Sequence, residues 1–196
     1  MRKPPVFYCQ LDYEDRPYPS PSNPKGNIAD NGCGPCSAAM VAENMLGIDF
    51  KPWDACELAI ACGAREKPGT DLYIFAPVFA ERVGLCVRDT EDADEAAAFL
   101  RAGRGLVIAN TQGNRPDWTG VFSDSGHYIV LAALEGNEVN VWDPMYRPGR
   151  YDIPGRAGKV RMEGNEAHAD FSIVREDCKD RPYFLFWKPG TERGEK

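Results

Sequence analysis

The chain has 196 residues, a hydrophobic fraction of 43% and a formal net charge of −7 at pH 7. This length predicts one domain, residues 1–196, with enough apolar side chains to bury a core. The acidic charge argues against nucleic acid as a partner. No apolar run reaches the roughly 20 residues that a membrane span requires. The first residues lack the apolar stretch of a signal peptide, so we expect a cytoplasmic protein.

The cysteines are odd in number and scattered, and they show no metal-binding repeat of spacings. Such a set favours reduced thiols over a disulfide framework, and we predict neither a metal nor another cofactor. The seven cysteines are at positions 9, 33, 36, 56, 62, 86 and 178.

The first part of the chain, residues 1–30, is predicted to be an extended segment because its six prolines exclude a long helix. Within it, residues 6–11 have a short β-like pattern. Four helices are then predicted from apolar residues at spacings of three and four, with proline or acidic residues at their starts. They cover residues 33–46, 52–62, 70–83 (where Pro77 interrupts the pattern) and 92–102.

After residue 102, and in one short run before it, the apolar pattern is that of strands. Short runs at 85–88, 105–110, 127–134, 138–142, 171–174 and 183–187 are strand candidates. A turn at 135–137 makes a hairpin of the strands around it. The connections 111–126 and 144–170 are expected to be surface loops that flank a cleft, and 188–196 a frayed tail. Helices followed by an antiparallel sheet indicate an α+β fold.

A candidate nucleophile lies at the start of the first long helix, in the sequence Asn-Gly-Cys-Gly-Pro-Cys. Pro35 suits a first helical turn, and Gly47 is placed to end the helix. Cys33 therefore lies where free N–H groups and the helix dipole favour a thiolate.

Two further residues can act with this thiol. His127 opens the most apolar strand, and Asp143 follows the partner strand one hairpin later, directly before Pro144. In an antiparallel hairpin the start of one strand lies opposite the end of the next, with residue 134 facing about 138 and 127 facing about 145. The sequence therefore predicts a nucleophile, a base and an orienting carboxylate close together. His168, the second histidine, lies in a polar run and is expected to be a solvated loop residue.

These motifs resemble the papain-like cysteine peptidases of family thirty-nine, which include the bacteriocin-processing double-glycine peptidases. The similarity spans about residues 6–145 through Gln-Leu-Asp, Gly-Cys-Gly-Pro, Gly-His-Tyr-Ile-Val-Leu and Val-Trp-Asp-Pro. The resemblance implies a papain-like fold, with Cys33 as nucleophile, His127 as base and acid, Asp143 as orienter and Gln10 as an oxyanion-hole donor. It also implies a peptidase or amidase that hydrolyses a peptide or isopeptide-like amide through a thioester.

Several alternatives remain open at this point. Cys36 is a second candidate nucleophile, because some papain-type enzymes use the second cysteine of such a pair. Cys-Gly-Pro-Cys also matches a thiol–disulfide oxidoreductase, although the polar residues before it make a poor strand. The same thiol could serve an acyltransferase, or the fold could be that of an inactive binding protein. The sequence predicts a peptide or protein substrate without naming it, and Trp118 in the 111–126 loop could either line the cleft or anchor the loop.

Overall fold

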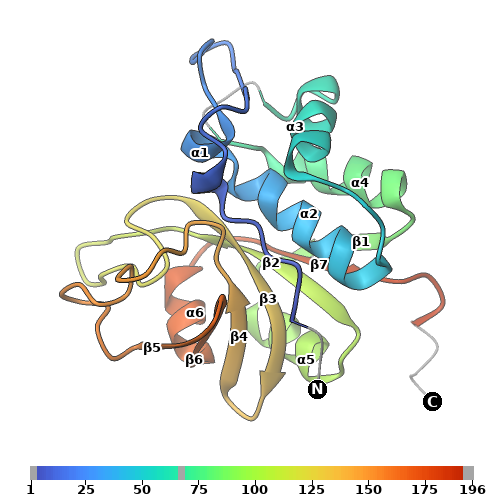
Figure 1. Cartoon of the computed structure of the whole chain (residues 1–196). Helices are drawn as coiled ribbons and strands as arrows, with labels where there is room; N and C mark the ends of the chain where they lie inside the picture. Colours follow the sequence, from blue (N-terminus) through green and yellow to red (C-terminus); the bar gives the residue numbers. More distant parts are fainter. Residues whose placement is uncertain (1–3, 66–68, 192–196) are drawn as a thin grey trace.

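The computed structural model describes residues 4–65 and 69–191. Its centre is a seven-stranded, wholly antiparallel sheet in the order β1-β7-β2-β3-β4-β6-β5 (Figure 1). The strands are β1 (Cys86–Thr90), β2 (Gly105–Thr111), β3 (His127–Glu135), β4 (Glu138–Trp142), β5 (Val160–Glu163), β6 (Glu166–Asp170) and β7 (Tyr183–Trp187).

Helices cover both faces of this sheet, which gives an α+β fold as predicted (Figure 1). On one side lie α1 (Ile28–Asn31), α2 (Cys33–Leu46), α3 (Pro52–Ala61) and α4 (Leu72–Val83), preceded by a short 3-10 helix, η1 (Gln10–Asp12). On the other side lie α5 (Ala93–Arg101) and α6 (Phe171–Asp177). None of the helices in the described part of the chain is long and apolar enough to cross a bilayer.

The sheet separates two apolar clusters because side chains alternate between its faces. On β2, Leu106 and Ile108 pack toward α2 and α4, whereas Val107 and Ala109 pack toward α5. The central helix is α2, whose residues from Gly34 to Ala42 are buried and which contacts β2 and β3. It ends as predicted at Gly47, whose φ of 68° is left-handed.

Helices α3, α4 and α5 lie where the sequence places them. Proline starts α3, and the side chains of Asp71 and Asp92 cap α4 and α5 by accepting hydrogen bonds from backbone N–H groups. Contrary to the expected interruption, α4 continues through Pro77. Pro77 is exposed, so the carbonyl that lacks its N–H partner lies on the solvent side of the helix.

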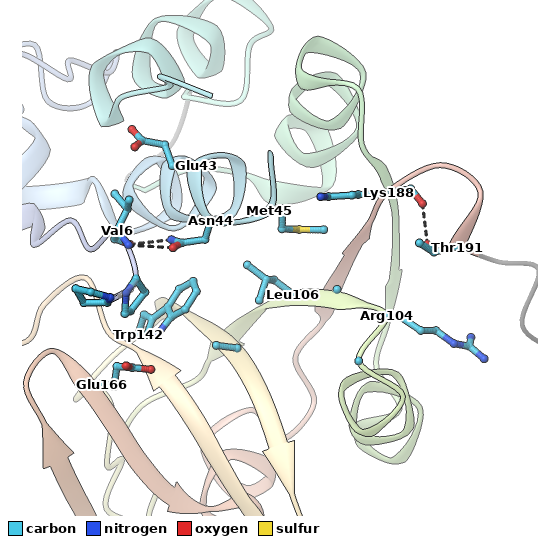
Figure 2. Close-up of a pocket in the computed structure, with 15 residues that line it drawn as sticks. Val6, Glu43, Asn44, Met45, Arg104, Leu106, Trp142, Glu166, Lys188 and Thr191 are labelled. Carbon is cyan, nitrogen blue, oxygen red and sulfur yellow. Dashed lines mark hydrogen bonds between the residues drawn. The ribbon is translucent and has the colours of Figure 1, made fainter. Parts of the chain in front are cut away.

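The N-terminal expectation is partly wrong. Residues 6–9 form no strand, and Gln10 begins η1 instead. The segment is held by side chains, because Asn44 of α2 accepts a hydrogen bond from the Val6 N–H at 2.9 Å and donates one to the Val6 carbonyl at 2.8 Å (Figure 2). An amide side chain thus satisfies the backbone groups that a strand partner would bind. Residues 1–3, part of the predicted extended segment, lie outside the described residues.

Two predictions for the C-terminal third are also wrong. The strand expected at 171–174 is helix α6, whose start is capped by the Asp170 carboxylate and whose buried Phe171 and Val174 have helical spacing. The loop expected at 144–170 contains the hairpin β5–β6, which extends the sheet by pairing with β4. His168 therefore lies on a strand, close to the carboxylates of Glu138 and Glu163. Of the predicted tail, residues 188–191 form a turn and the rest lies outside the described residues.

Candidate active site

Cys33 is the first residue of α2 and is partly exposed to a cavity of about 500 Å³. Gly32 caps the helix, and a side chain there would meet the Ile28 carbonyl at 2.5 Å, so the tight junction of α1 and α2 requires glycine. The first N–H groups of a helix have no intrahelical partner and favour an anion. The local fold thus places the Cys33 sulfur at a cavity wall, beside free donors.

His127 is the first residue of β3, and its side chain is only 2% exposed. Its Nε2 lies 2.7 Å from Oδ1 of Asp143, which leaves Nδ1 for the thiol of Cys33. Burial disfavours the imidazolium, but the charge and hydrogen bond of Asp143 and the contact with Cys33 outweigh it and raise the pKa of His127 to about 9.

The pKa of the Cys33 thiol shifts in the opposite direction. Burial alone would raise it, but the hydrogen bond and charge of His127, together with the N–H groups of Tyr128 and Gly34, give a net lowering. A thiol with a lowered pKa beside an imidazole with a raised pKa favours a thiolate–imidazolium pair.

The β3–β4 hairpin brings Asp143 to His127. Next to the turn Glu135 pairs with Glu138, one residue away from the predicted register, and a bulge between Leu131 and Ala133 then shifts the pairing. Beyond the bulge Val130 pairs with Trp142, so Asp143 follows at the level of Ile129, diagonally across from His127. His127 and Asp143 are therefore neighbours, as predicted, and the bulge sets the register that brings them together.

Asp143 is 1% exposed, and both of its carboxylate oxygens are occupied. Oδ1 also accepts from the Met145 N–H at 2.8 Å, while Oδ2 accepts from Arg150 Nε at 2.8 Å and from the Tyr151 hydroxyl at 2.6 Å. Burial would raise the pKa of Asp143, but the charges of His127 and Arg150 and these hydrogen bonds hold it well below its usual range. The carboxylate is thereby fixed in the ionised form and aimed at His127.

Arg150 and Tyr151 also contact Asp143, although no motif in the sequence singles them out. They lie in the segment that was expected to be a glycine- and arginine-rich surface loop, yet Tyr151 is buried and Arg150 lines the same cavity as Cys33. The only sequence signal was an Arg-Tyr pair 7 and 8 positions after Asp143, in a segment without helix or strand periodicity.

Gln10 lies in the wall of the cavity that holds Cys33 and His127 and is 2% exposed. Its backbone N–H donates to the Pro144 carbonyl at 2.7 Å, and its side-chain Nε2 donates to the Ala29 carbonyl at 2.7 Å. An amide nitrogen has two donors, so one remains after the bond to Ala29. The structure thus brings Gln10, Cys33 and His127 to one cavity, and Asp143 lies behind His127, in contact with its ring.

The other walls come from the two long connections, as expected. Ser123–Gly126 contribute from the first, and Met145 and Arg150 contribute from the second. Trp118 is not among the lining residues, because its Nε1 donates to Asp177 Oδ1 at 2.6 Å and its ring lies under Lys159. Of the two roles considered, it has that of a loop anchor.

Cys36 differs from Cys33 in every respect that governs reactivity. It lies one turn further along α2, is 0% exposed and belongs to the apolar cluster between helices and sheet. Burial, with smaller effects of neighbouring thiols, raises the pKa of Cys36 well above its ordinary value. The segment before the Cys-Gly-Pro-Cys sequence is the short helix α1, whereas the oxidoreductase context requires a strand.

A second cavity of about 600 Å³ lies near the C-terminal end of α2 (Figure 2). Met45, Leu106 and Trp142 line it together with Glu43, Glu166 and Lys188. None of the described residues in its wall is a cysteine or a histidine, so it holds no thiol–imidazole pair. Among the described residues there is also no cluster of three or more potential metal ligands.

Neither a protein-family model nor a curated protein sequence matches this chain. Solved structures are similar to it, among them the following two. The peptidase domain of Streptococcus ComA, a bi-functional ABC transporter involved in quorum sensing, is 15% identical with a TM-score of 0.53, over 81% of this chain and 92% of that one. A candidate C39-like peptidase from Bacillus anthracis is 14% identical with a TM-score of 0.58, over 93% of this chain and 94% of that one. The predicted resemblance is thus confirmed for the fold: this chain has the papain-like α+β fold of the C39 cysteine peptidase domains.

Proposed function

We propose that this protein is a cysteine peptidase or amidase that hydrolyses a peptide or isopeptide-like amide through a thioester. The observation that carries the proposal is the continuous contact from Cys33 to His127, which both line one cavity, and from His127 to the buried Asp143 behind it. A thiol, an imidazole and a buried carboxylate in this order are the parts needed for nucleophilic acyl transfer.

In the proposed reaction, the Cys33 thiolate attacks the amide carbon and forms a tetrahedral intermediate. The N–H of Cys33, at the first position of α2, and the remaining Nε2 donor of Gln10 stabilise the oxyanion. The imidazolium of His127 protonates the leaving amine, and the C–N bond breaks to give a thioester. Neutral His127 then takes a proton from water, which attacks the thioester and releases the acid. Asp143 keeps the ring oriented throughout.

The environments of the two cysteines support Cys33 as the nucleophile. Its sulfur is partly exposed and has a lowered pKa, whereas Cys36 is fully buried with a raised pKa. Thiolate character and access together decide cysteine reactivity. A thioester can also pass its acyl group to an amine, so product analysis with and without added amine separates a hydrolase from an acyltransferase.

The test is alkylation with iodoacetamide at neutral pH, followed by mapping of the labelled peptide. We expect rapid labelling of wild type and of Cys36→Ala at residue 33, and its loss in Cys33→Ala. Cys36→Ala controls for the removal of a thiol from the same helix. Equal labelling of wild type and Cys33→Ala, with loss in Cys36→Ala, would transfer the nucleophile to Cys36.

A second measurement tests the role of His127. The imidazolium lowers the pKa of Cys33, so His127→Ala should move the midpoint of the alkylation pH profile upward, toward the free-thiol value of about 8.5. His168→Ala is the matched control, because His168 lies on β6 beside Glu138 and Glu163 and does not line the Cys33 cavity. An alkylation profile that does not move in His127→Ala would contradict the proposed pair.

A further inference from the structure

The proposed reaction leaves one conspicuous thiol unused. Cys36 is separated from Cys33 only by Gly34 and Pro35, on the same side of the first turn of α2. Its fully buried side chain excludes direct reaction with a substrate. It does not exclude reaction with the neighbouring sulfur, and the charge on Cys33 is close enough to contribute to the raised pKa of Cys36.

We propose that Cys33 and Cys36 are a site of reversible oxidation, in which peroxide converts the exposed sulfur to a sulfenic acid and the buried sulfur then closes a disulfide. The inference rests on the proposed function only for its consequence, which is that closure removes the nucleophile. The site itself stands on the positions of the two cysteines three residues apart on α2 and on the cavity that Cys33 lines, through which a small oxidant can reach it.

The helix geometry is close to what a disulfide requires. Residues three apart on a helix have Cβ atoms about 5–6 Å apart, whereas a disulfide needs about 3.5–4.5 Å. The first turn must therefore tighten by about 1–2 Å. In this turn the Cys36 N–H bonds to the Gly32 carbonyl at 2.8 Å, Pro35 has no N–H, and the N–H groups of residues 33 and 34 precede the intrahelical ladder. Few hydrogen bonds oppose the movement.

The chemistry balances with peroxide as the only co-reactant. The Cys33 thiolate attacks hydrogen peroxide, an S–O bond forms, the O–O bond breaks, and the hydroxide that leaves is protonated to water. The sulfur of Cys36 then attacks the sulfur of Cys33, the S–S bond forms and the S–O bond breaks. The hydroxide that leaves takes the proton of the Cys36 thiol and becomes a second water, so two thiols and one peroxide give one disulfide and two waters. A dithiol reductant reverses the step by exchange.

The environments of the two sulfurs suit these separate roles. The lowered pKa of Cys33 and its access to the cavity favour attack on peroxide. The buried Cys36 is protected from the same oxidant until its neighbour has reacted. Two other buried thiols lie in the same half of the molecule: Cys9, which donates to the Tyr146 carbonyl at 3.3 Å, and Cys56 on α3. They are the competing partners that a test must distinguish.

The experiment treats the reduced full chain with hydrogen peroxide, blocks remaining thiols with N-ethylmaleimide, and maps peptides without reduction. We expect a disulfide between residues 33 and 36. Iodoacetamide labelling of Cys33 should fall about tenfold or more, because a disulfide sulfur does not alkylate. It should return after treatment with dithiothreitol. A disulfide to Cys9 or Cys56, or no disulfide while Cys33 is oxidised, overturns the proposal.

A variant pair gives an independent readout. Cys36→Ala should label at Cys33 as wild type does before oxidation. After peroxide its Cys33 should pass to sulfinic and sulfonic acids, so dithiothreitol no longer restores labelling. Cys56→Ala, which removes a buried thiol from the adjacent helix, should recover like wild type. Recovery of Cys36→Ala to the wild-type level contradicts the inference. These readouts need no peptide substrate, so they remain decisive if the chain proves to hydrolyse no amide.

Discussion

Two carboxylates, Asp143 and Asp177, are almost fully buried, and each accepts several hydrogen bonds. Asp143 accepts from Arg150, Tyr151 and the Met145 N–H, and it contacts His127. Asp177 accepts only from neutral donors, namely the Trp118 indole at 2.6 Å and the backbone N–H groups of Val121 and Phe122. They are equally buried, but they differ in the charge of their partners.

Their pKa values move in opposite directions. Burial tends to raise both, yet the charges of His127 and Arg150 hold the pKa of Asp143 well below its usual range. For Asp177 the neutral donors and the smaller effect of the Arg156 charge do not compensate burial, and its pKa is raised. The number of hydrogen bonds therefore does not decide the direction of the pKa shift of a buried carboxylate, but charged groups in direct contact with it do, as His127 and Arg150 are with Asp143. Only Asp143 is suited to stabilise an imidazolium, whereas Asp177 fixes the loop that supplies the cleft wall.

The largest expected effect is that of Asp143→Asn. Asparagine keeps the size of the side chain but removes the charge that favours the imidazolium of His127. Loss of an orienting carboxylate of this kind lowers turnover by up to about 10⁴-fold. The midpoint of the pH profile of Cys33 alkylation should also move upward, toward the pKa of a free thiol, about 8.5. An unchanged profile, measured with iodoacetamide in a variant that remains folded, would remove Asp143 from the proposed mechanism.

Asp177→Asn should instead act on stability. Its amide nitrogen cannot accept hydrogen bonds, so at least one of the buried donors from Trp118, Val121 and Phe122 is left unpaired. Each unpaired buried donor costs about 1–3 kcal/mol. We expect a lower free energy of unfolding in urea, while the midpoint of Cys33 alkylation in the folded protein stays at the wild-type pH. A large shift of that midpoint would show that the two carboxylates are coupled.

The same comparison shows what the sequence could predict. The strands with continuous apolar residues, such as β3 and β7, and the helices with proline or aspartate at their starts were located correctly. Periodicity failed where an element is short: four residues from Phe171 cannot separate a strand from a helix, and β6 contains none of the β-branched residues that mark a strand. Local patterns specify an element only when it spans several repeats.

The site divides in the same way. Cys33, His127 and Asp143 were found because a helix start and one hairpin, both local features, determine their positions. The contacts that stabilise the site do not follow from a helix or strand pattern. Trp118 and Asp177 are 59 positions apart, and the partners of Asp143 return from a segment without a clear pattern. Such partners follow only from the tertiary fold.

Acidification should change the contributions of Asp143 and Asp177 to the free energy of unfolding in opposite directions. A lowered pKa means that Asp143 contributes stability above its ordinary value of about 3.9 and loses it as pH falls through the folded pKa. A raised pKa means that the contribution of Asp177 is full below about 3.9 and is lost as pH rises through the folded pKa. From neutral pH to about pH 4, the difference in unfolding free energy from wild type should grow for Asp177→Asn, and as pH falls further below about 4 it should shrink for Asp143→Asn. If urea titrations showed the same pH trend for both variants, the opposite pKa shifts of Asp143 and Asp177 would be contradicted.

The smallest effects are expected from single donors, and the chain offers a matched pair. Tyr151 donates to Asp143 and Trp118 donates to Asp177, both at 2.6 Å, and each can be replaced by phenylalanine. A hydrogen bond to a charged group is worth about 1.5–3 kcal/mol, so both variants should lose stability of this order. Only Tyr151→Phe should alter the chemistry, because loss of its hydrogen bond raises the pKa of Asp143, and the acid-side loss of Cys33 alkylation should begin at higher pH. Trp118→Phe should leave the acid side of the alkylation profile unchanged, because Asp177, the carboxylate that Trp118 contacts, touches neither His127 nor Cys33. A shift of the same size in both variants would mean that the position of the loop, and not the charge on Asp143, controls the pKa of the Cys33 thiol.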